Sequence, residues 1–144
     1  VPGERVVLEL TEHVPIEDYD LVLEHLEPMR ARGMHVAVDD AGAGYAGLQR
    51  LVRLEPEIVK LDRELTVGID TDPARRAMAA SMVHFAGEIG AEVVGEGIEN
   101  QAAVDALRQL GVTLGQGFHL ARPGPLPTEA WHVDVGPASV AARG

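Results

Sequence analysis

Residues 36–40 read Val36-Ala37-Val38-Asp39-Asp40, a short apolar run that ends in two carboxylates. Burying a charge is costly unless it is paired or holds a metal, so a structural core gives little reason for acids at the end of a buried strand. Other short apolar runs end at Glu9, Lys60 and Glu96, and a fifth leads to Gln116. In a (β/α) barrel the active site lies at the C-terminal ends of parallel strands. We therefore expect one shared site, and this residue set favours metal-dependent chemistry.

Strand and helix signals alternate along almost the whole chain. The expected strands are 6–10, 35–39, 57–61, 92–95 and 112–120, and the expected helices are 16–31, 48–54, 73–88 and 101–110. We expect Pro28 to kink the first helix or end it early, Asp72 and Asn100 to cap later helices, and residues 41–47 to form a loop. Such alternation predicts parallel strands joined by right-handed crossovers.

The spacing of these units favours an α/β fold of the (β/α) TIM-barrel type. A closed eight-stranded barrel takes roughly 250 residues, so five units in a 144-residue chain predict an incomplete barrel. The alternative is a doubly wound sheet of flavodoxin type, which needs a phosphate-binding loop after the first strand. Glu9-Leu10-Thr11-Glu12 is not such a loop. We expect a partial barrel domain over 1–126 and a C-terminal tail over 127–144.

Composition narrows the functional classes. The net charge of −11 opposes nucleic-acid binding and suits a divalent-metal site, although acidic surfaces also simply keep proteins soluble. Cysteine is absent, which excludes disulfides and thiol chemistry and agrees with the cytoplasm, where we expect the protein unless a longer parent is tethered to a membrane. The chain begins with Val-Pro-Gly and not with Met, so we expect it to be a piece of something longer.

Asp39-Asp40 is the strongest local signal. Neighbouring residues of a strand point to opposite faces, but both carboxylates can converge where the backbone turns at a strand's end. One aspartate could then bridge two cations about 3.5–4 Å apart, the usual clamp for in-line displacement at phosphorus. Mg²⁺ or Mn²⁺ suits such an all-oxygen shell. The alternative is a helix N-cap with a spare acid.

The remaining strand ends carry polar groups with open alternatives. Lys60 could steer phosphate or hold the attacking water, with Asp62 fixing it from the same strand face, or the two could form an internal salt bridge. Glu96 could be a metal ligand or a base, and Gly97 beside it permits close approach. Gln116 could contact substrate or water, or could be an ordinary satisfied polar residue.

Two further glutamates and a glycine-rich segment lie near these strand ends. Glu9 could ligate metal, whereas Glu12 alone is better explained as a charge at the start of the next helix. Glu99 could anchor a loop. Residues 42–47 lack the Gly-Lys-Ser/Thr of a Walker loop and are interpreted as a loop beside the metal aspartates.

Five motifs occur together in a recognisable order between about residue 5 and Pro123. They are Glu9-Leu10-Thr11-Glu12, Asp39-Asp40-Ala41-Gly42-Ala43-Gly44-Tyr45, Lys60-Leu61-Asp62, Glu96-Gly97-Ile98-Glu99 and Gln116-Gly117-Phe118. In order and spacing this chain resembles EAL domains, cyclic di-GMP phosphodiesterases with a modified (β/α) barrel. The resemblance implies two-metal hydrolysis of one phosphodiester bond, which gives the linear dinucleotide pGpG.

The resemblance also implies roles for individual residues. Asp39 resembles a ligand that bridges two Mg²⁺ or Mn²⁺ ions, and Lys60 resembles the lysine near the nucleophilic water. Glu96 resembles the base or a ligand, so Asp39, Lys60 and Glu96 form the implied catalytic group. The implied metal ligands are Glu9, Asp39, Asp40 and Glu96. Gln116 resembles a residue near the phosphates, and Glu12 and Glu99 resemble residues that hold the loop after Asp40. A homodimer through the barrel and an N-terminal sensory or regulatory domain are also implied.

The chain departs from the family pattern in two ways. The Glu-Ala-Leu strand and the next strand, which carries an Asn ligand, are absent, and we expect both upstream of Val1 in a longer parent. Ala41 and Ala43 replace a Phe anchor and a hydroxyl residue of the usual loop. The rival hypothesis is a degenerate module that binds cyclic di-GMP or a protein partner without catalysis. A barrel hydrolase or aldolase outside the family is a third. The retained acids and Lys60 favour the enzyme.

Overall fold

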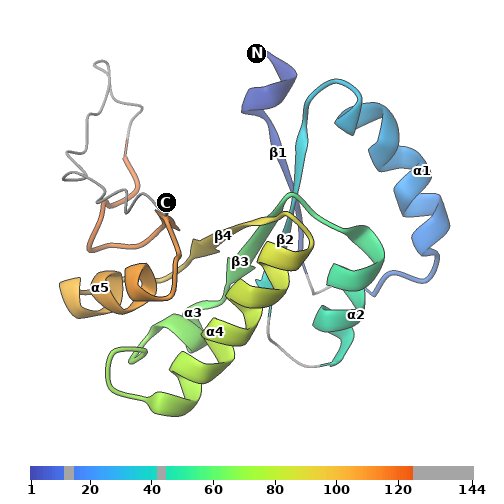
Figure 1. The fold of residues 1–144 in the computed structure, drawn as a ribbon. Coiled ribbons are helices and arrows are strands. Elements are labelled where there is room, and N and C mark those ends of the chain that lie inside the picture. The colour runs from blue at the N-terminus through green and yellow to red at the C-terminus, as the bar shows by residue number, and fades with distance from the viewer. Residues whose placement is uncertain (12–14, 42–44, 125–144) are drawn as a thin grey trace, which may run out of the picture.

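The computed structural model describes residues 1–11, 15–41 and 45–124 (Figure 1). One parallel sheet contains five strands: β1 Val7–Leu10, β2 His35–Ala41, β3 Ile58–Leu61, β4 Glu92–Gly95 and β5 Leu114–Gly115. The helices are α1 Tyr19–Arg30, α2 Tyr45–Leu54, α3 Arg63–Thr66, α4 Pro73–Glu88 and α5 Gln101–Gln109, and a 3-10 turn, η1, covers Gly3–Arg5.

The order of the strands identifies the architecture. Strands that follow one another in the chain lie next to one another in the sheet, from β1 to β5, and every pair is parallel. A doubly wound sheet reverses its strand order at a switch point, and the described strands show no reversal. The predicted partial (β/α) barrel is therefore confirmed, with five consecutive strands of the eight that a closed barrel has.

The hydrophobic core lies on the helix side of the sheet. Val36 and Val38 of β2 and Val59 and Leu61 of β3 are buried, and they belong to one cluster with residues of α2, α4 and α5. Because side chains alternate along a strand, the intervening residues occupy the opposite face. Lys60 is one of them, and Glu9 lies likewise between Leu8 and Leu10 of β1, which pack against the cluster, so the charged side chains are separated from the apolar core by the sheet itself.

Local signals set most helix ends as predicted. The side chain of Asp72 accepts hydrogen bonds from the first backbone N–H groups of α4, and Pro73 occupies the first turn. Asn100 accepts from Ala103 N at 2.8 Å at the start of α5. In the described part of the chain, no helix combines the length and apolarity needed to cross a membrane.

Three predicted segments have different bounds in the structure, and one helix was not predicted. Helix α1 begins at Tyr19, because Asp18 caps it, and continues past Pro28 to Arg30. The loop expected over 41–47 is shorter, since β2 includes Ala41 and α2 begins at Tyr45. Strand β5 has only two residues. Helix α3 was missed because four residues are too few to show a helical period. The predicted tail, 127–144, lies outside the described residues.

Candidate active site

A β-bulge in β2 sets the backbone of both aspartates opposite Lys60. Val38 pairs with Val59 and Ala41 pairs with Leu61, so Asp39 and Asp40 together lie opposite the single residue Lys60. A bulge of this kind puts two residues against one and changes the direction of side chains. We had expected the two aspartates to stand where the strand ends and the backbone turns. That position was wrong, because β2 continues to Ala41. The side chain of Asp40 lies outside the description.

Three carboxylates from three other strands meet one ammonium group. Lys60 Nζ lies 2.7 Å from Glu96 Oε1, 3.2 Å from Glu9 Oε2 and 3.3 Å from Asp39 Oδ1. We call these four residues the Lys60 cluster. Glu9 comes from β1, Asp39 from β2 and Glu96 from the residue after β4. The predicted convergence of these strand ends is therefore present in the fold, around the only lysine in the sequence.

The Lys60 cluster carries more negative than positive charge. Burial by itself would lower the pKa of Lys60, but hydrogen bonds to Glu96 and Glu9, the charge of Glu96 and a hydrogen bond to Asp39 together raise that pKa well above its ordinary value. The ammonium therefore stays charged at neutral pH. The cluster thus sets three carboxylate side chains against one ammonium, an excess of acidic groups that suits a divalent cation.

The donors of the cluster fit a hard divalent cation. All its acidic side chains offer oxygen, the ligand that Mg²⁺ and Mn²⁺ prefer. Within the described ranges, no three acidic or histidine side chains stand in a ready metal-holding arrangement. The carboxylates are instead directed at the ammonium of Lys60, and the side chain of Asp40, a predicted fourth ligand, is not described. The carboxylate oxygens are therefore suitable ligands for Mg²⁺ or Mn²⁺. In this structure they surround the ammonium group of Lys60.

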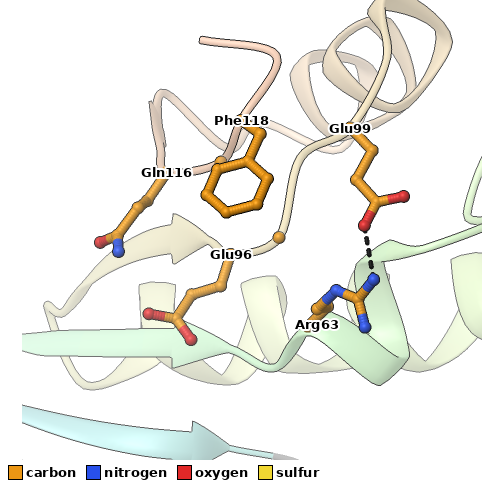
Figure 2. A pocket seen from close by; sticks show the side chains of 7 residues that line it. Arg63, Glu96, Glu99, Gln116 and Phe118 are labelled. Carbon is orange, nitrogen blue, oxygen red and sulfur yellow. Dashed lines mark hydrogen bonds and ion pairs between the residues drawn. The ribbon is translucent and has the colours of Figure 1, made fainter. Parts of the chain in front are cut away.

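A cavity of about 310 Å³ lies beside Glu96 (Figure 2). Its lining residues are Arg63, Glu96, Gly97, Glu99, Gln116, Gly117 and Phe118. Glu96 therefore belongs to both the cavity and the Lys60 cluster. The backbone of Gln116 is held by two hydrogen bonds, from its N–H to Gly95 O at 2.8 Å and from Ile98 N to its carbonyl at 3.1 Å. Gln116 is thereby placed where a group bound next to Glu96 would meet it.

Two glycines of this cavity allow close approach. Gly97 has φ +61°, and a Cβ there would lie 2.3 Å from Arg63 Cγ. A Cβ on Gly117 would lie 2.2 Å from the backbone nitrogen of Ile98. Close approach at Gly97 was expected, and the group that approaches is the stem of Arg63. A side chain at either position would push the segment after β4 away from its neighbours.

The other predicted residues have mixed placements. Asp62 is half-buried just before α3, and Lys60 forms its ion pairs with the three acids of the cluster and not with Asp62. Glu99 forms an ion pair with Arg63, with Oε1 and Nη2 2.5 Å apart. Its predicted target, the loop after Asp40, falls within 42–44, which lies outside the described residues. Glu12 also lies outside them.

Two residues near the site gave no usable signal in the sequence. Arg50 on α2 is 4% exposed and donates to Thr11 O at 2.6 Å, just beyond β1. Thr66 on α3 is fully buried, and its hydroxyl donates to the carbonyl of Glu96. An arginine in an amphipathic helix is expected at the surface, and a single threonine forms no sequence motif. Their place near the site is shown only by hydrogen bonds to residues far away in the sequence.

Comparisons with known proteins agree with this geometry. Residues 1–123 match the EAL domain family. The chain is 36% identical over 125 residues to the cyclic di-GMP phosphodiesterase RocR of Pseudomonas aeruginosa, covering 87% of this chain and 32% of that protein. It superposes on the crystal structure of the EAL domain of Mycobacterium smegmatis DcpA with a TM-score of 0.80 and 32% identity, covering 85% of this chain and 55% of the other.

A second solved structure is a manganese and cyclic di-GMP complex of Klebsiella pneumoniae BlrP1. Its TM-score is 0.74 at 36% identity, over 82% of this chain and 30% of that one. The chain thus spans about a third of RocR and of BlrP1 and just over half of the DcpA domain. The match over residues 1–123, the parallel strand order and the acids around Lys60 lead to one conclusion: this chain belongs to the EAL domain family.

Proposed function

We propose that the natural protein containing this chain hydrolyses cyclic di-GMP to linear pGpG in a reaction that depends on two Mg²⁺ or Mn²⁺ ions. The observation that carries the proposal is the Lys60 cluster, in which Glu9, Asp39 and Glu96 converge on one ammonium. Membership of the EAL family and the manganese and cyclic di-GMP complex of BlrP1 support the choice of substrate and of ion.

The reaction requires water to attack one phosphorus atom while its bond to the 3′ oxygen breaks. The water oxygen becomes part of the new terminal phosphate, and one water proton ends on the 3′ oxygen. Divalent ions, when bound, supply charge stabilisation for this in-line displacement. The residues proposed to hold them are Glu9, Asp39, Asp40 and Glu96.

The remaining roles follow from position. Lys60 stays protonated, so it can hold the phosphate or the attacking water but cannot act as a base at neutral pH. Glu96 borders both the Lys60 cluster and the cavity, so it is the carboxylate best placed to accept a proton from that water. Gln116 is proposed to contact the phosphates.

A homodimer through the barrel, an N-terminal sensory or regulatory domain and a cytoplasmic location are further parts of the proposal. Leu48 and Val52, one turn apart on α2, are 43% and 60% exposed and offer an apolar surface to a second copy. Light scattering of the natural protein, with Val52→Glu as the variant, tests the dimer. A dimer unaffected by Val52→Glu would place the interface elsewhere.

The decisive experiment measures pGpG formation by chromatography, with Mg²⁺, with Mn²⁺ and with a chelator. Asp39→Asn should abolish turnover, because a neutral amide cannot bridge two cations as a carboxylate does. Asp40→Asn should cause similar or smaller damage. Asp70→Asn is the matched control, since Asp70 is exposed on the connection between α3 and α4. Turnover of Asp39→Asn at saturating metal would refute the proposed site. Tight binding of cyclic di-GMP without any pGpG would favour the non-catalytic module.

A further inference from the structure

Helix α3 contacts the segment that carries Glu96 through the buried hydroxyl group of Thr66. Thr66 is 0% exposed, and its Oγ1 lies within hydrogen-bond distance of the carbonyl oxygens of Arg63 and Glu96. The bond to Arg63 O, at 3.2 Å, is a local one within the short helix. The bond to Glu96 O joins residues 30 positions apart. The bond is partly shielded from water, so loss of the donor is costly and the bond constrains the backbone of Glu96.

A second contact comes from Arg63, at the first position of α3. Its stem lies against Gly97, where a Cβ would be 2.8 Å from Arg63 Cβ, and its guanidinium pairs with Glu99 (Figure 2). The side chains of Arg63 and Glu99 are 66% and 47% exposed, and such a pair adds little to overall stability. The effect of the pair is local. Together with the bond from Thr66 to Glu96, it attaches both ends of the segment 96–99 to α3.

Helix α3 is itself held from α4. Arg75 Nη1 donates to the carbonyl oxygen of Glu64, within α3, and to Val67 O, just after α3, at 2.6 Å. Arg75 Nε additionally pairs with Asp72 Oδ2 at 3.2 Å. A four-residue helix would be marginal alone, but these bonds attach it to the 16-residue α4. It can therefore serve as a fixed support.

We propose that Thr66 and Arg63 are positioning residues: α3 clamps residues 96–99 so that the Glu96 carboxylate faces Lys60 in the orientation that turnover requires. The proposal rests on the hydrolase function proposed above for the same site. It assigns to α3 a part in catalysis although neither residue belongs to the Lys60 cluster. Lys60 lies at the end of β3 and α3 begins three residues later, so the same stretch of chain places both members of the Lys60–Glu96 pair.

The first test replaces the hydroxyl in the natural protein. Thr66→Val keeps the shape of the side chain and removes the donor, whereas Thr66→Ser keeps the donor. We expect kcat for cyclic di-GMP to fall about tenfold in Thr66→Val, equivalent to about 1.4 kcal/mol, with KM nearly unchanged, and to recover in Thr66→Ser. Thr71→Val is the matched control, because Thr71 makes the same kind of bond, to Gly68 O at 3.2 Å, away from Glu96.

The second test does not depend on turnover. Amide hydrogen exchange of the peptide over 95–101 should be faster in Thr66→Val and in Arg63→Met, which keeps the stem over Gly97 and removes the charge. Arg53→Met, at an exposed arginine of α2, is the control. If the protein does not hydrolyse cyclic di-GMP, the proposed function is refuted. The hydrogen-exchange measurement would still show whether α3 holds residues 96–99 in place. Unchanged exchange in Arg63→Met and in folded Thr66→Val, or a Thr66→Val that loses stability but keeps kcat, would overturn the inference. If Thr66→Val does not fold, Arg63→Met alone decides.

Discussion

Replacing Lys60 by Met removes the ammonium group that Glu9, Asp39 and Glu96 share. Met keeps a long unbranched chain, so packing changes little, while the three carboxylates lose their common partner. We expect the metal-free protein to be strongly destabilised and the metal-bound protein much less so, because a divalent cation can replace the lost charge. Turnover should be lost in both conditions, since Lys60 is proposed to hold the phosphate or the attacking water.

The expected size of the destabilisation follows from burial. The side chains of Asp39 and Glu96 are 20% and 18% exposed, so their partnership with Lys60 is largely shielded from water. Removing one partner of such a pair costs about 3–5 kcal/mol. Glu9 is 51% exposed and adds only about 0–1 kcal/mol. With a urea m-value of about 2 kcal/mol/M, the unfolding midpoint should fall by about 2 M.

The assay is urea unfolding of wild type and Lys60→Met, followed by circular dichroism, with a chelator and with excess Mn²⁺. The difference in unfolding free energy between the two proteins should shrink when Mn²⁺ is present. Arg53→Met serves as the control for the loss of an exposed cation and should show no difference in either condition. Equal stability of wild type and Lys60→Met in the chelator, or a deficit that Mn²⁺ leaves unchanged, would refute the electrostatic account of the Lys60 cluster.

Four other perturbations test separate parts of the structure. Gly97→Ala should destabilise by at least about 1–2 kcal/mol in urea unfolding, because φ is +61° and the new Cβ would collide with Arg63; a neutral result would mean that the loop can move. Asn100→Ala should cost about 1 kcal/mol by the same assay through loss of the α5 cap, and an unchanged midpoint would show that the cap is dispensable. Folding raises the pKa of Lys60 above its ordinary 10.5, so the contribution of its charge to stability is complete below that value and is lost as pH rises through the folded pKa; the midpoint difference from Lys60→Met should therefore stay constant between about pH 6 and 9, and a fall within that range would contradict it. Among the described strands β1 and β5 stand at the two edges of the sheet, and edge strands invite pairing, so the 144-residue chain should self-associate in light scattering; a monodisperse monomer would be evidence against this expectation.

Much of the fold was predictable because its signals are local. Short apolar runs mark β2 and β3, and caps such as Asp72 and Asn100 mark helix starts, since each cap bonds backbone groups within three residues of itself. The acids and the lysine at the strand ends predicted a common site, because parallel strands end at one edge of the sheet. The strand order confirmed the barrel interpretation that these signals favoured.

The remainder depended on contacts between distant parts of the chain. The bulge that sets Asp39 and Asp40 opposite Lys60 is a property of the pairing of β2 with β3, and neither strand records that register in its own residues. Arg63 and Glu99 are 36 positions apart, and Arg50 reaches Thr11 across 39. Periodicity tells which face of an element is apolar, but a polar residue finds its partner only when the elements pack. The sequence by itself therefore determined the class of fold and the chemical groups of the site, and the tertiary structure decided how those groups are oriented and what holds them in place.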